Sequence, residues 1–339
     1  MKNEHGHFLK GEKVVLAGDI GGTKTHLGLY AIDAGGPRTL EVVTYPSRDV
    51  AGLEEMIRDI LARRETTIVA ACFGIACPVV GGACRPTNLN WSVSEDRLRR
   101  IFGWRQVEIL NDLATTAIAA PRLASNVLTT LNPGQPQNGG NMALVAPGTG
   151  LGQALLLPEL KGYRPVASEG GHADFAPNNT AELELWRFLH QRFGHVSVER
   201  VLSGQGLVNI FDWLCSSAGQ APSPAVRRAM ATEDPAAVIT RHAMDGDDSL
   251  CSDALQRFCR IFGAVAGNLA LTGMATGGVY LGGGIPPKIL PALKKAAFME
   301  GFIAKGRFHD FMTAIPVQVI REDRAALMGA AQRAYELAT

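Results

Sequence analysis

The sequence predicts an α/β fold with two domains, and three observations support this prediction. Strand-like and helix-like segments alternate in the first third of the chain, as they do in α/β proteins. Several strand-like runs end in glycine clusters, and 339 residues are enough for two domains of ordinary size. We expect strands near 13–20, 25–32 and 40–45, a helix through Leu53–Arg64, and strands at Thr67–Gly74 and Gln106–Leu110.

The pattern changes after residue 123, where a second domain is expected to begin. A stretch rich in Pro, Gly and Asn, Leu131–Asn141, predicts an exposed loop, and the apolar run Met142–Ala146 predicts the next strand. Helical spacing of apolar residues then dominates, at Ala181–Phe193, Gly206–Ser216, Leu250–Leu271 and Glu322–Leu337. Two domains of this kind make a cleft between them plausible.

Composition narrows the class of protein. Apolar residues make up 46% of the chain, charged residues 19%, and the net charge is +1. A net charge of +1 does not indicate the basic surface that binds nucleic acid or an anionic membrane. No apolar run is long enough to span a bilayer. Residues 1–12 are polar and are expected to form a flexible leader, so the cytoplasm is the expected location. The six cysteines have no C-x-x-C spacing and are predicted to be buried free thiols.

The first glycine cluster lies in Leu16–Tyr30, between two strand-like runs. Gly21 and Gly22 allow backbone N–H groups to approach an anion closely, and Asp19 would repel phosphate unless a cation lay between them. A magnesium-bound nucleotide fits that arrangement. The segment is nearly a P-loop, but the residues after Thr25 favour a strand where a P-loop requires a helix. The alternative is an ordinary Gly-Gly hairpin turn.

Two further glycine clusters follow strand-like runs. Gly148, Thr149 and Gly150 could donate hydrogen bonds to terminal phosphates, with a plain hairpin turn as the alternative. The cluster Gly282, Gly283 and Gly284 is followed by a helix expected near Pro286 or Pro287. Glycines there leave room for a flat ring, so we interpret this cluster as an adenosine site; a tight strand-to-helix turn is the alternative.

Between these clusters, a strand delivers Asn111 and Asp112 to the start of a helix rich in small residues. Asp112 is a candidate acceptor for the proton of an attacking hydroxyl, because phosphoryl transfer needs a positioned acceptor more than a strong base. Asn and Asp are also preferred helix N-caps, so a purely structural role is the alternative.

The remaining polar cluster contains Glu169 and His172, and Glu199 follows later in the chain. Carboxylates and an imidazole that converge on a small polar molecule suit a sugar, whose adjacent hydroxyls each need a donor or an acceptor. A metal site formed by Glu169, His172 and Asp174 is less favoured because these ligands crowd one loop. For Glu199 alone, a solvated charge at a helix end is the alternative.

Taken in order, these motifs resemble those of the bacterial glucokinase family, and the resemblance covers nearly the whole chain after residue 13. The motifs are Asp19-Ile-Gly-Gly-Thr23, Phe73-Gly-Ile-Ala-Cys-Pro78, Thr87-Asn-Leu-Asn-Trp91, Leu110-Asn-Asp112, Gly148-Thr-Gly-Leu-Gly152, Glu169-Gly-Gly-His172, Glu199-Arg-Val-Leu-Ser-Gly204 and Gly282-Gly-Gly284. The family belongs to the actin-like ATPase superfamily of sugar kinases, which implies a ribonuclease H-like fold with an interdomain cleft. The resemblance further implies a small domain of residues 13–122 plus 323–339 and a large domain of residues 123–322.

The resemblance implies ATP-dependent phosphorylation of the 6-hydroxyl of D-glucose with Mg²⁺. Asp112 is then the expected catalytic base and a substrate ligand. The other expected hexose ligands are Asn88, Asn111, Glu169, His172 and Glu199. Asp19 is expected to hold Mg²⁺ through water, and ATP is expected at Asp19, Gly21, Gly22, Thr23, Gly148, Thr149, Gly150, Gly282 and Gly283. A homodimer is also implied. The Cys-rich zinc motif and N-terminal helix-turn-helix of related repressors are absent from the sequence.

Two alternatives to a glucokinase stay open at the level of the sequence. One keeps the chemistry and changes the sugar to fructose, mannose or an N-acetylhexosamine, because the choice among hexoses depends on fine placement of the polar ligands. The other is a catalytically silent sugar- or nucleotide-binding sensor, since a fold does not decide function.

Overall fold

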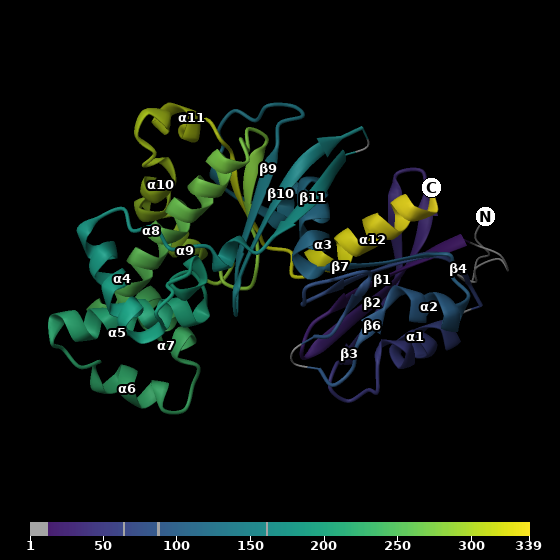
Figure 1. Cartoon of the computed structure of the whole chain (residues 1–339), viewed down its shortest axis with the longest axis horizontal. Coiled ribbons are helices and arrows are strands. Elements are labelled where there is room, and N and C mark those ends of the chain that lie inside the picture. Colours follow the sequence, from purple (N-terminus) through teal and green to yellow (C-terminus); the bar gives the residue numbers. More distant parts are fainter. Residues whose placement is uncertain (1–12, 64, 87–88, 161) are drawn as a thin grey trace. The chain divides into compact units, whose positions relative to one another are not determined.

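The computed structural model describes residues 13–63, 65–86, 89–160 and 162–339 (Figure 1). The chain divides into two compact units. Unit 1 contains the described residues up to Leu123 together with Glu322–Thr339, and unit 2 contains Ala124–Arg321. The leader at 1–12 and the expected hexose ligand Asn88 lie outside the described residues.

Unit 1 is built on a five-stranded sheet in the order β3-β2-β1-β4-β7. The strands are β1 (Lys13–Ile20), β2 (Lys24–Asp33), β3 (Gly36–Pro46), β4 (Thr67–Ile75) and β7 (Gln106–Asn111). Strands β1, β4 and β7 are parallel, whereas β1 and β2 form an antiparallel hairpin. The predicted strands and the predicted hairpin are therefore confirmed. A small second sheet pairs β5 (Ala83–Cys84) with β6 (Val93–Ser94).

Helices cover both faces of this sheet, because the strands bury side chains on both faces. One face packs on α1 (Leu53–Ala62) and α2 (Glu95–Phe102) through the cluster that contains Leu16 and Ile57. The other face packs on α12 (Ala325–Ala338) through Val15 and Leu327. Helix α12 also lies against α3 (Asp112–Ala119), which continues into a 3-10 turn, η1 (Ala120–Arg122). Gly329 permits that close approach, since a Cβ there would meet the main-chain oxygen of Thr115.

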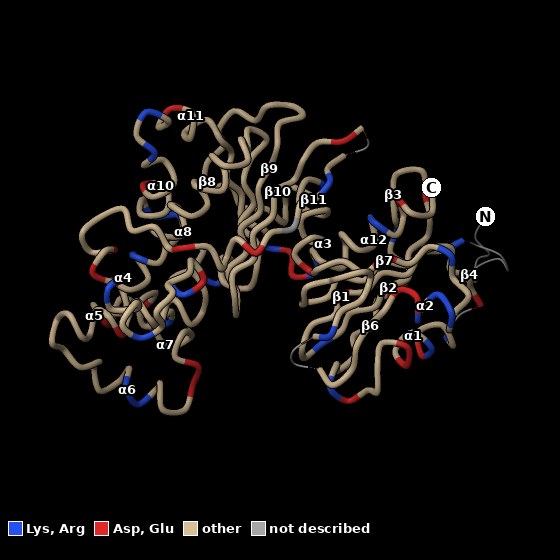
Figure 2. Tube along the Cα trace, viewed as in Figure 1, with Lys and Arg blue, Asp and Glu red and all other residues tan. Residues whose placement is uncertain are grey.

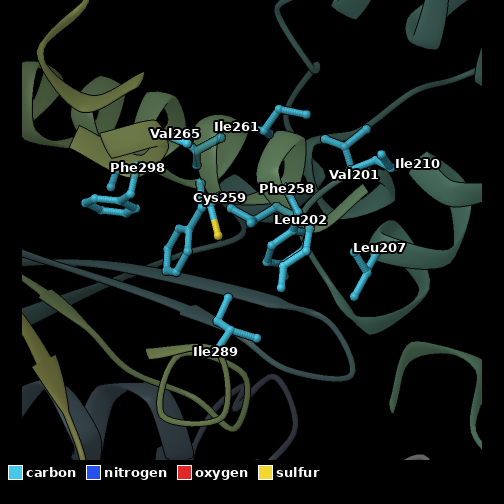
Figure 3. Close-up of a cluster of buried hydrophobic side chains, with 14 of the residues drawn as sticks. Val201, Leu202, Leu207, Ile210, Phe258, Cys259, Ile261, Val265, Ile289 and Phe298 are labelled. Carbon is cyan, nitrogen blue, oxygen red and sulfur yellow. The ribbon is translucent and has the colours of Figure 1, made fainter. Parts of the chain in front are cut away.

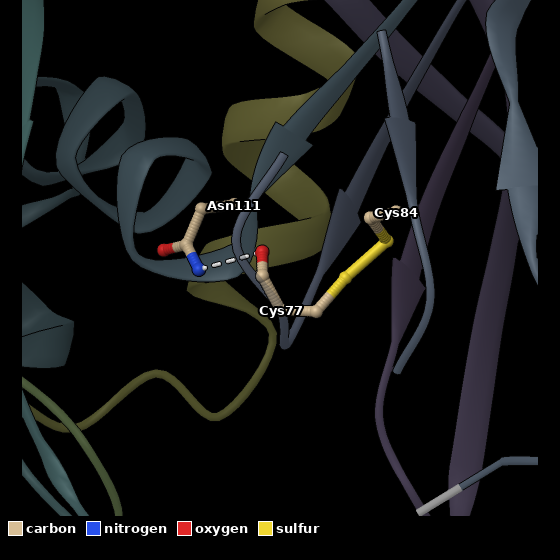
Figure 4. Close-up of a disulfide and its surroundings, with 3 residues drawn as sticks. All are labelled: Cys77, Cys84 and Asn111. Carbon is tan, nitrogen blue, oxygen red and sulfur yellow. Dashed lines mark hydrogen bonds between the residues drawn. A yellow bond between two sulfur atoms is a disulfide. The ribbon is translucent and has the colours of Figure 1, made fainter. Parts of the chain in front are cut away.

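The prediction of free thiols is wrong for two of the six cysteines. Cys77 and Cys84 form a disulfide (Figure 4), whereas Cys72, Cys215, Cys251 and Cys259 are free. The chain reverses between the two half-cystines, where the backbone groups of Val80 and Ala83 pair with each other. This turn brings together two residues whose separation of seven gave no signal of pairing in the sequence.

Unit 2 is built on a six-stranded sheet in the order β11-β10-β9-β12-β13-β8. The strands are β8 (Leu128–Asn132), β9 (Met142–Pro147), β10 (Leu151–Glu159), β11 (Gly162–Ser168), β12 (Gly278–Leu281) and β13 (Val317–Ile320). Strands β9, β12 and β13 are parallel, and β9, β10 and β11 form an antiparallel meander. The predicted strand pair around the second glycine cluster is confirmed.

The helices of unit 2 pack around α8, which is buried along much of its length (Figure 3). They are α4 (Thr180–Phe193), α5 (Gly204–Ala218), α6 (Pro224–Met230), α7 (Pro235–Asp245), α8 (Ser249–Thr272), α9 (Leu290–Leu293), α10 (Ala296–Ile303) and α11 (His309–Thr313), with 3-10 turns η2 (Ser125–Val127), η3 (Gly170–His172), η4 (Val198–Arg200) and η5 (Gly306–Phe308). The long helices α4, α5 and α8 confirm the periodicity read from the sequence.

One helix in unit 2 begins later than the sequence predicts. The expected start was Pro286 or Pro287, but α9 begins at Leu290 and residues 286–289 form a turn. Pro286 and Pro287 have no main-chain N–H group, so neither can donate a hydrogen bond to this turn. The turn is instead closed by N–H groups of Lys288 and Ile289, which both donate to the Ile285 oxygen.

Charged residues of both signs are interspersed in each unit, as Figure 2 shows. Many form exposed ion pairs, such as Arg241 with Glu233 and Arg38 with Asp33. Pairs of this kind contribute little to stability. No helix in the described ranges combines the length and the apolar character that crossing a membrane requires.

Candidate active site

In unit 1, the predicted acidic residues lie at one edge of the sheet. Asp19 is the penultimate residue of β1, and its register partner in the parallel strand β4 is Gly74. Asn111 ends β7, which is parallel to β4, and Asp112 follows it. The carboxyl ends of parallel strands share an edge, which is the usual location of ligand sites in α/β proteins.

The two carboxylates at this edge are buried enough to change their titration. Burial, together with the smaller effect of the nearby Asp112 charge, raises the pKa of Asp19 to about 7. Burial also raises the pKa of Asp112, although the hydrogen bond from the Leu113 N–H to its Oδ1 (2.9 Å) acts in the opposite direction. Within the described ranges, neither carboxylate forms an ion pair with a basic side chain. The edge therefore holds two carboxyl groups without an ion-pair partner among the described residues, and their raised pKa values reflect that setting.

Asn111 and Asp112 also hold the start of α3, which is the structural alternative considered for them. The Asn111 Oδ1 accepts the Leu113 N–H (2.9 Å), so Asn111 is the N-cap of the helix. Its Nδ2 donates to the main-chain oxygen of Cys77 (3.3 Å), next to the disulfide (Figure 4). The capping role fixes both side chains at the sheet edge, and it leaves a ligand-binding role open to them.

The first glycine turn, Gly21–Thr23, links β1 and β2 beside Asp19. The Gly21 N–H donates to the Lys24 oxygen (3.0 Å), and the Thr23 oxygen accepts the N–H of Ser47 (2.9 Å). The hairpin alternative thus describes the local geometry. Because the Gly21 N–H is used inside the turn, Gly22 and Thr23 are the better placed donors for a ligand.

In unit 2, the second glycine turn borders a cavity of about 780 Å³. Gly148 and Thr149 line this cavity together with residues of α5, of α7 and of the segment after β12. Its volume is within the range of sites that bind drug-sized ligands and cofactors. A second cavity of unit 2, about 300 Å³, includes Gly170 in its lining. In unit 1, a cavity of about 520 Å³ lies beside α12 and is lined by none of the predicted site residues.

The third glycine cluster contributes to the large cavity through Gly284, and Gly282 and Gly283 do not line it. The Gly282 N–H donates to the Val145 oxygen (2.9 Å). Gly283 has a φ of 81°, and a Cβ there would lie 2.5 Å from the Pro147 oxygen. These two glycines therefore allow the segment after β12 to pack closely on β9, which is the structural alternative for this cluster.

Several residues that line the large cavity escaped the sequence analysis. They are Gly204, Gln205, Asp234, Thr240, Arg241 and Lys288. Five of them lie on or next to α5 and α7, and α7 itself was not predicted. Asp234 followed by Pro235 was an available signal, because Asp is a preferred N-cap and Pro a preferred first helical residue.

The predicted sugar ligands of unit 2 surround the same glycine turn. Glu199 accepts the Leu151 N–H through Oε2 (2.8 Å), directly after Gly150. The loop with Glu169 and His172 passes close by, since a Cβ on Gly171 would lie 2.3 Å from the Leu151 oxygen. Glu169 and His172 are exposed, and Glu199 is half-buried. The structure therefore brings the Glu199 carboxylate to the second glycine turn and the backbone of the Glu169–His172 loop to the strand that follows it.

The alternative metal site on this loop has little support in its geometry. The Asp174 Oδ1 lies 2.9 Å from Nε2 of His195, so its side chain already has a partner. Across the part of the chain that the structure describes, no three or more His, Cys, Asp or Glu side chains form a group that could hold a metal ion.

Comparison with known proteins gives consistent matches over most of the chain. A family model described as Glucokinase matches residues 16–337. A glucokinase from Synechocystis sp. is 39% identical over 343 residues, covering 93% of this chain and 96% of the relative. The crystal structure of a glucokinase from an Antarctic psychrotroph is similar at 32% identity with a TM-score of 0.84, covering 95% of this chain and 99% of that one. A ROK family glucokinase from Streptomyces griseus, solved with glucose and AMPPNP, is similar in fold at 21% identity with a TM-score of 0.61, covering 95% and 99%.

Proposed function

Since the chain belongs to the glucokinase family and is an ATP-dependent glucokinase, we propose that Asp112 is its catalytic base for transfer to the 6-hydroxyl of D-glucose. Its mixed α/β architecture is the actin-like ATPase fold that the resemblance predicted. The observation that carries the proposal is the pair of half-buried carboxylates, without an ion-pair partner among the described residues, at the edge of the unit 1 sheet. We also propose that units 1 and 2 are the two functional domains.

In the proposed reaction, the 6-hydroxyl of the hexose gives its proton to Oδ2 of Asp112, because Oδ1 accepts the Leu113 N–H. The oxygen of that hydroxyl forms a bond to the γ-phosphorus of ATP, and the bond between this phosphorus and the bridging oxygen of ADP breaks. Burial helps in two ways: it raises the pKa of Asp112 toward that of a useful base, and it strengthens the hydrogen bond to the hydroxyl.

The hexose is held, in this proposal, by Asn111 and Asp112 from unit 1 and by Glu169, His172 and Glu199 from unit 2. Each of these side chains can donate to or accept from a sugar hydroxyl. Asn111 is fixed by its two hydrogen bonds, so the amide presents a fixed face to a ligand. Asn88 is proposed as a further ligand because it belongs to the motif Thr87-Asn-Leu-Asn-Trp91.

The nucleotide is assigned to the large cavity of unit 2, whose volume accommodates an adenosine. Gly148, Thr149 and Gly150 are proposed to contact the terminal phosphates, and the segment with Gly282 and Gly283 to border the base through Gly284. The glycine turn of unit 1, at Gly21–Thr23, is proposed as the second phosphate contact. The AMPPNP bound to the Streptomyces griseus relative supports ATP as the phosphate donor.

Mg²⁺ is proposed as the cation that accompanies the nucleotide. The residues present fit such an ion, because Asp19 places a hard oxygen ligand at the edge of unit 1 without an ion-pair partner among the described residues. One carboxylate alone forms an incomplete shell, which suits an ion that keeps several waters and binds phosphate oxygens. When bound, the ion would neutralise charge that develops on the phosphates. Asp19 would hold it through water.

The direct test is an assay for glucose 6-phosphate with D-glucose, Mg²⁺ and ATP, followed by a panel of fructose, mannose and N-acetylglucosamine at equal concentration. We expect the highest kcat/KM with glucose. Formation of a phosphorylated hexose with another member of the panel only would assign the protein to that sugar. Binding of glucose and ATP without any phosphorylated product would favour the silent sensor.

We further propose that the protein acts in the cytoplasm at the entry to glycolysis, where glucose 6-phosphate is consumed, and that it forms a homodimer. Light scattering coupled to size-exclusion chromatography measures the second point directly. A mass of twice the 36.1 kDa of one chain is expected, and a mass equal to one chain at all concentrations would contradict it.

A further inference from the structure

Glu199 has a contact that binding a sugar does not explain. Its Oε2 accepts the N–H of Leu151 at 2.8 Å, and Leu151 is the first residue of β10 after the turn Gly148–Gly150. A carboxylate that accepts a backbone N–H forms a charge-assisted hydrogen bond, which is about twice as strong as a neutral one. The carboxylate therefore holds one end of the turn assigned to the phosphates.

The turn leaves space for this carboxylate. A Cβ on Gly150 would lie 2.5 Å from Oε2 of Glu199 and 3.3 Å from its Cδ. The backbone of Gly150 is not in the left-handed region, so an ordinary residue could adopt its conformation. Glycine at this position is needed for space, and the group that occupies the space is Glu199.

A second hydrogen bond holds the other end of the turn to the same segment. The Gly204 N–H donates to the Gly148 oxygen at 2.9 Å, and the Gly148 N–H donates to the Gly150 oxygen at 2.8 Å. Residues 199–204 thus contact the turn at both of its ends. The shape of the turn depends on where that segment lies.

The segment itself is firmly anchored in the core of unit 2. Val201 and Leu202 are fully buried and pack in the cluster with Phe258 of α8 (Figure 3). The Ser203 Oγ donates to the Glu199 oxygen (2.8 Å), and Nδ2 of the fully buried Asn209 donates to the Arg200 oxygen (2.8 Å). The backbone around Glu199 is therefore fixed. Because the Glu199 carboxylate is hydrogen-bonded to Leu151, the position of this backbone determines the position of the turn.

We propose that Glu199 is a positioning residue for the nucleotide: through Leu151 it keeps the turn Gly148–Gly150 in the shape that binds phosphate, with or without a sugar present. The inference rests on the proposed function, in which this turn contacts the phosphates and Glu199 is also a hexose ligand. One carboxylate then serves both substrates, with Oε2 on the turn and Oε1 toward the hexose.

The test measures the Kd of Mg²⁺-ATP by isothermal titration calorimetry in the absence of sugar, for the full chain and three variants. Glu199→Ala removes the acceptor, and we expect its Kd for ATP to rise about tenfold, because the Leu151 N–H loses a charged partner. Glu199→Gln keeps an acceptor oxygen and is expected within about threefold of the parent. Glu169→Ala is the matched control, since it removes another proposed hexose carboxylate, and in the described part of the chain that carboxylate makes no hydrogen bond to the turn.

An unchanged Kd for ATP in Glu199→Ala would overturn the inference, even where that variant loses affinity for glucose as the proposed function expects. A raised Kd in both Glu199→Ala and Glu169→Ala would overturn it as well, because the effect would then not depend on Leu151. If Glu199→Ala does not fold, Gly150→Ala tests the same contact from the other side. That variant displaces the carboxylate and is expected to raise the Kd for ATP by a similar factor, and an unchanged value would contradict the inference.

Discussion

The candidate site residues of the two units differ in kind. At the edge of the unit 1 sheet, the distinctive groups are carboxyl groups: Asp19 and Asp112 are half-buried, and their pKa values are raised. The cavity of unit 2 is bordered by the turn Gly148–Gly150, where glycine leaves space for the supporting Glu199 carboxylate, and charged side chains of both signs line it. In the proposed function, unit 1 supplies the reactive carboxylate and unit 2 supplies the nucleotide cavity. Each prediction below changes one side of this comparison.

The largest effect is expected from Asp112→Asn. The amide keeps the size of the side chain and removes the proton acceptor, so kcat should fall about 10³-fold. The Kd for glucose should change by less than about threefold, because hydrogen bonding is largely retained. Rates are measured as glucose 6-phosphate formed at saturating substrates. Asp96→Asn, which alters an exposed carboxylate on α2, is the control, and undiminished turnover in Asp112→Asn would remove this residue from the chemistry.

The Asp19→Asn variant should lose activity and gain stability. We expect kcat to fall about 100-fold at fixed Mg²⁺, because the variant lacks the carboxylate proposed to hold the cation. The pKa of Asp19 is raised from 3.8 to about 7 in the folded protein, so folding favours the protonated form. Without Mg²⁺, this contribution to stability is present below pH 4 and is lost as the pH rises toward 7.

The asparagine variant does not titrate, so its stability should exceed that of the parent at pH 8 by on the order of 4 kcal/mol, with little difference at pH 4. Urea unfolding at the two pH values, without metal, measures this difference. Asp49→Asn, at an exposed position of unit 1, should change neither quantity. A variant that is less stable than the parent at pH 8 would show that the Asp19 charge is compensated in the folded state.

Breaking the disulfide should weaken unit 1 by a smaller amount. Closing a loop of this length stabilises a protein by about 2 kcal/mol in the chain-entropy description. We therefore expect Cys84→Ser, or the parent in a dithiol reductant, to lose about 2 kcal/mol in urea unfolding. The reductant should have no further effect on Cys84→Ser. A parent protein with six titratable thiols after unfolding without reductant would show that the bond does not form.

The smallest effect is expected from filling the cavity of unit 2. Ala237 is an exposed residue of α7 that lines this cavity, and Ala237→Trp would occupy part of the space assigned to the nucleotide. The Kd for ATP should rise about tenfold, and the Kd for glucose should stay the same. Ala231→Trp, at an exposed position that does not line the cavity, is the matched control. Equal ATP affinity in the two variants would place the nucleotide elsewhere.

Local patterns predicted much of the fold. The apolar run before Asp19, the hairpin after it and the helix that follows Asn111 were readable because each depends on neighbours in the sequence. Features that depend on distant packing were not readable. Thr240 and Arg241 line the cavity only because α7 lies beside α5, and Cys77 meets Cys84 only because the chain turns at Val80–Ala83.

The sequence predicted which residues form the candidate site, but it did not predict the local contacts that each residue makes. The sequence indicated Glu199 as a sugar ligand or a solvated charge, yet its hydrogen bond to Leu151 depends on how η4 packs against the start of β10. The contacts of Gly282 and Gly283 also depend on the fold. The sequence analysis assigned these glycines to an adenosine site, and in the structure they pack on β9. A glycine in a sequence indicates that space is needed, and only the fold identifies the group that fills the space.

We propose that unit 1 supplies the catalytic carboxylate and unit 2 supplies the nucleotide site. A crystal structure of the protein with glucose, Mg²⁺ and AMPPNP tests this claim most directly. The account predicts the adenosine in the cavity lined by Gly148, Thr149 and Gly284, and the 6-hydroxyl of glucose within about 3 Å of the Asp112 carboxylate. A nucleotide bound outside that cavity, or a 6-hydroxyl that contacts a different acceptor, would contradict it.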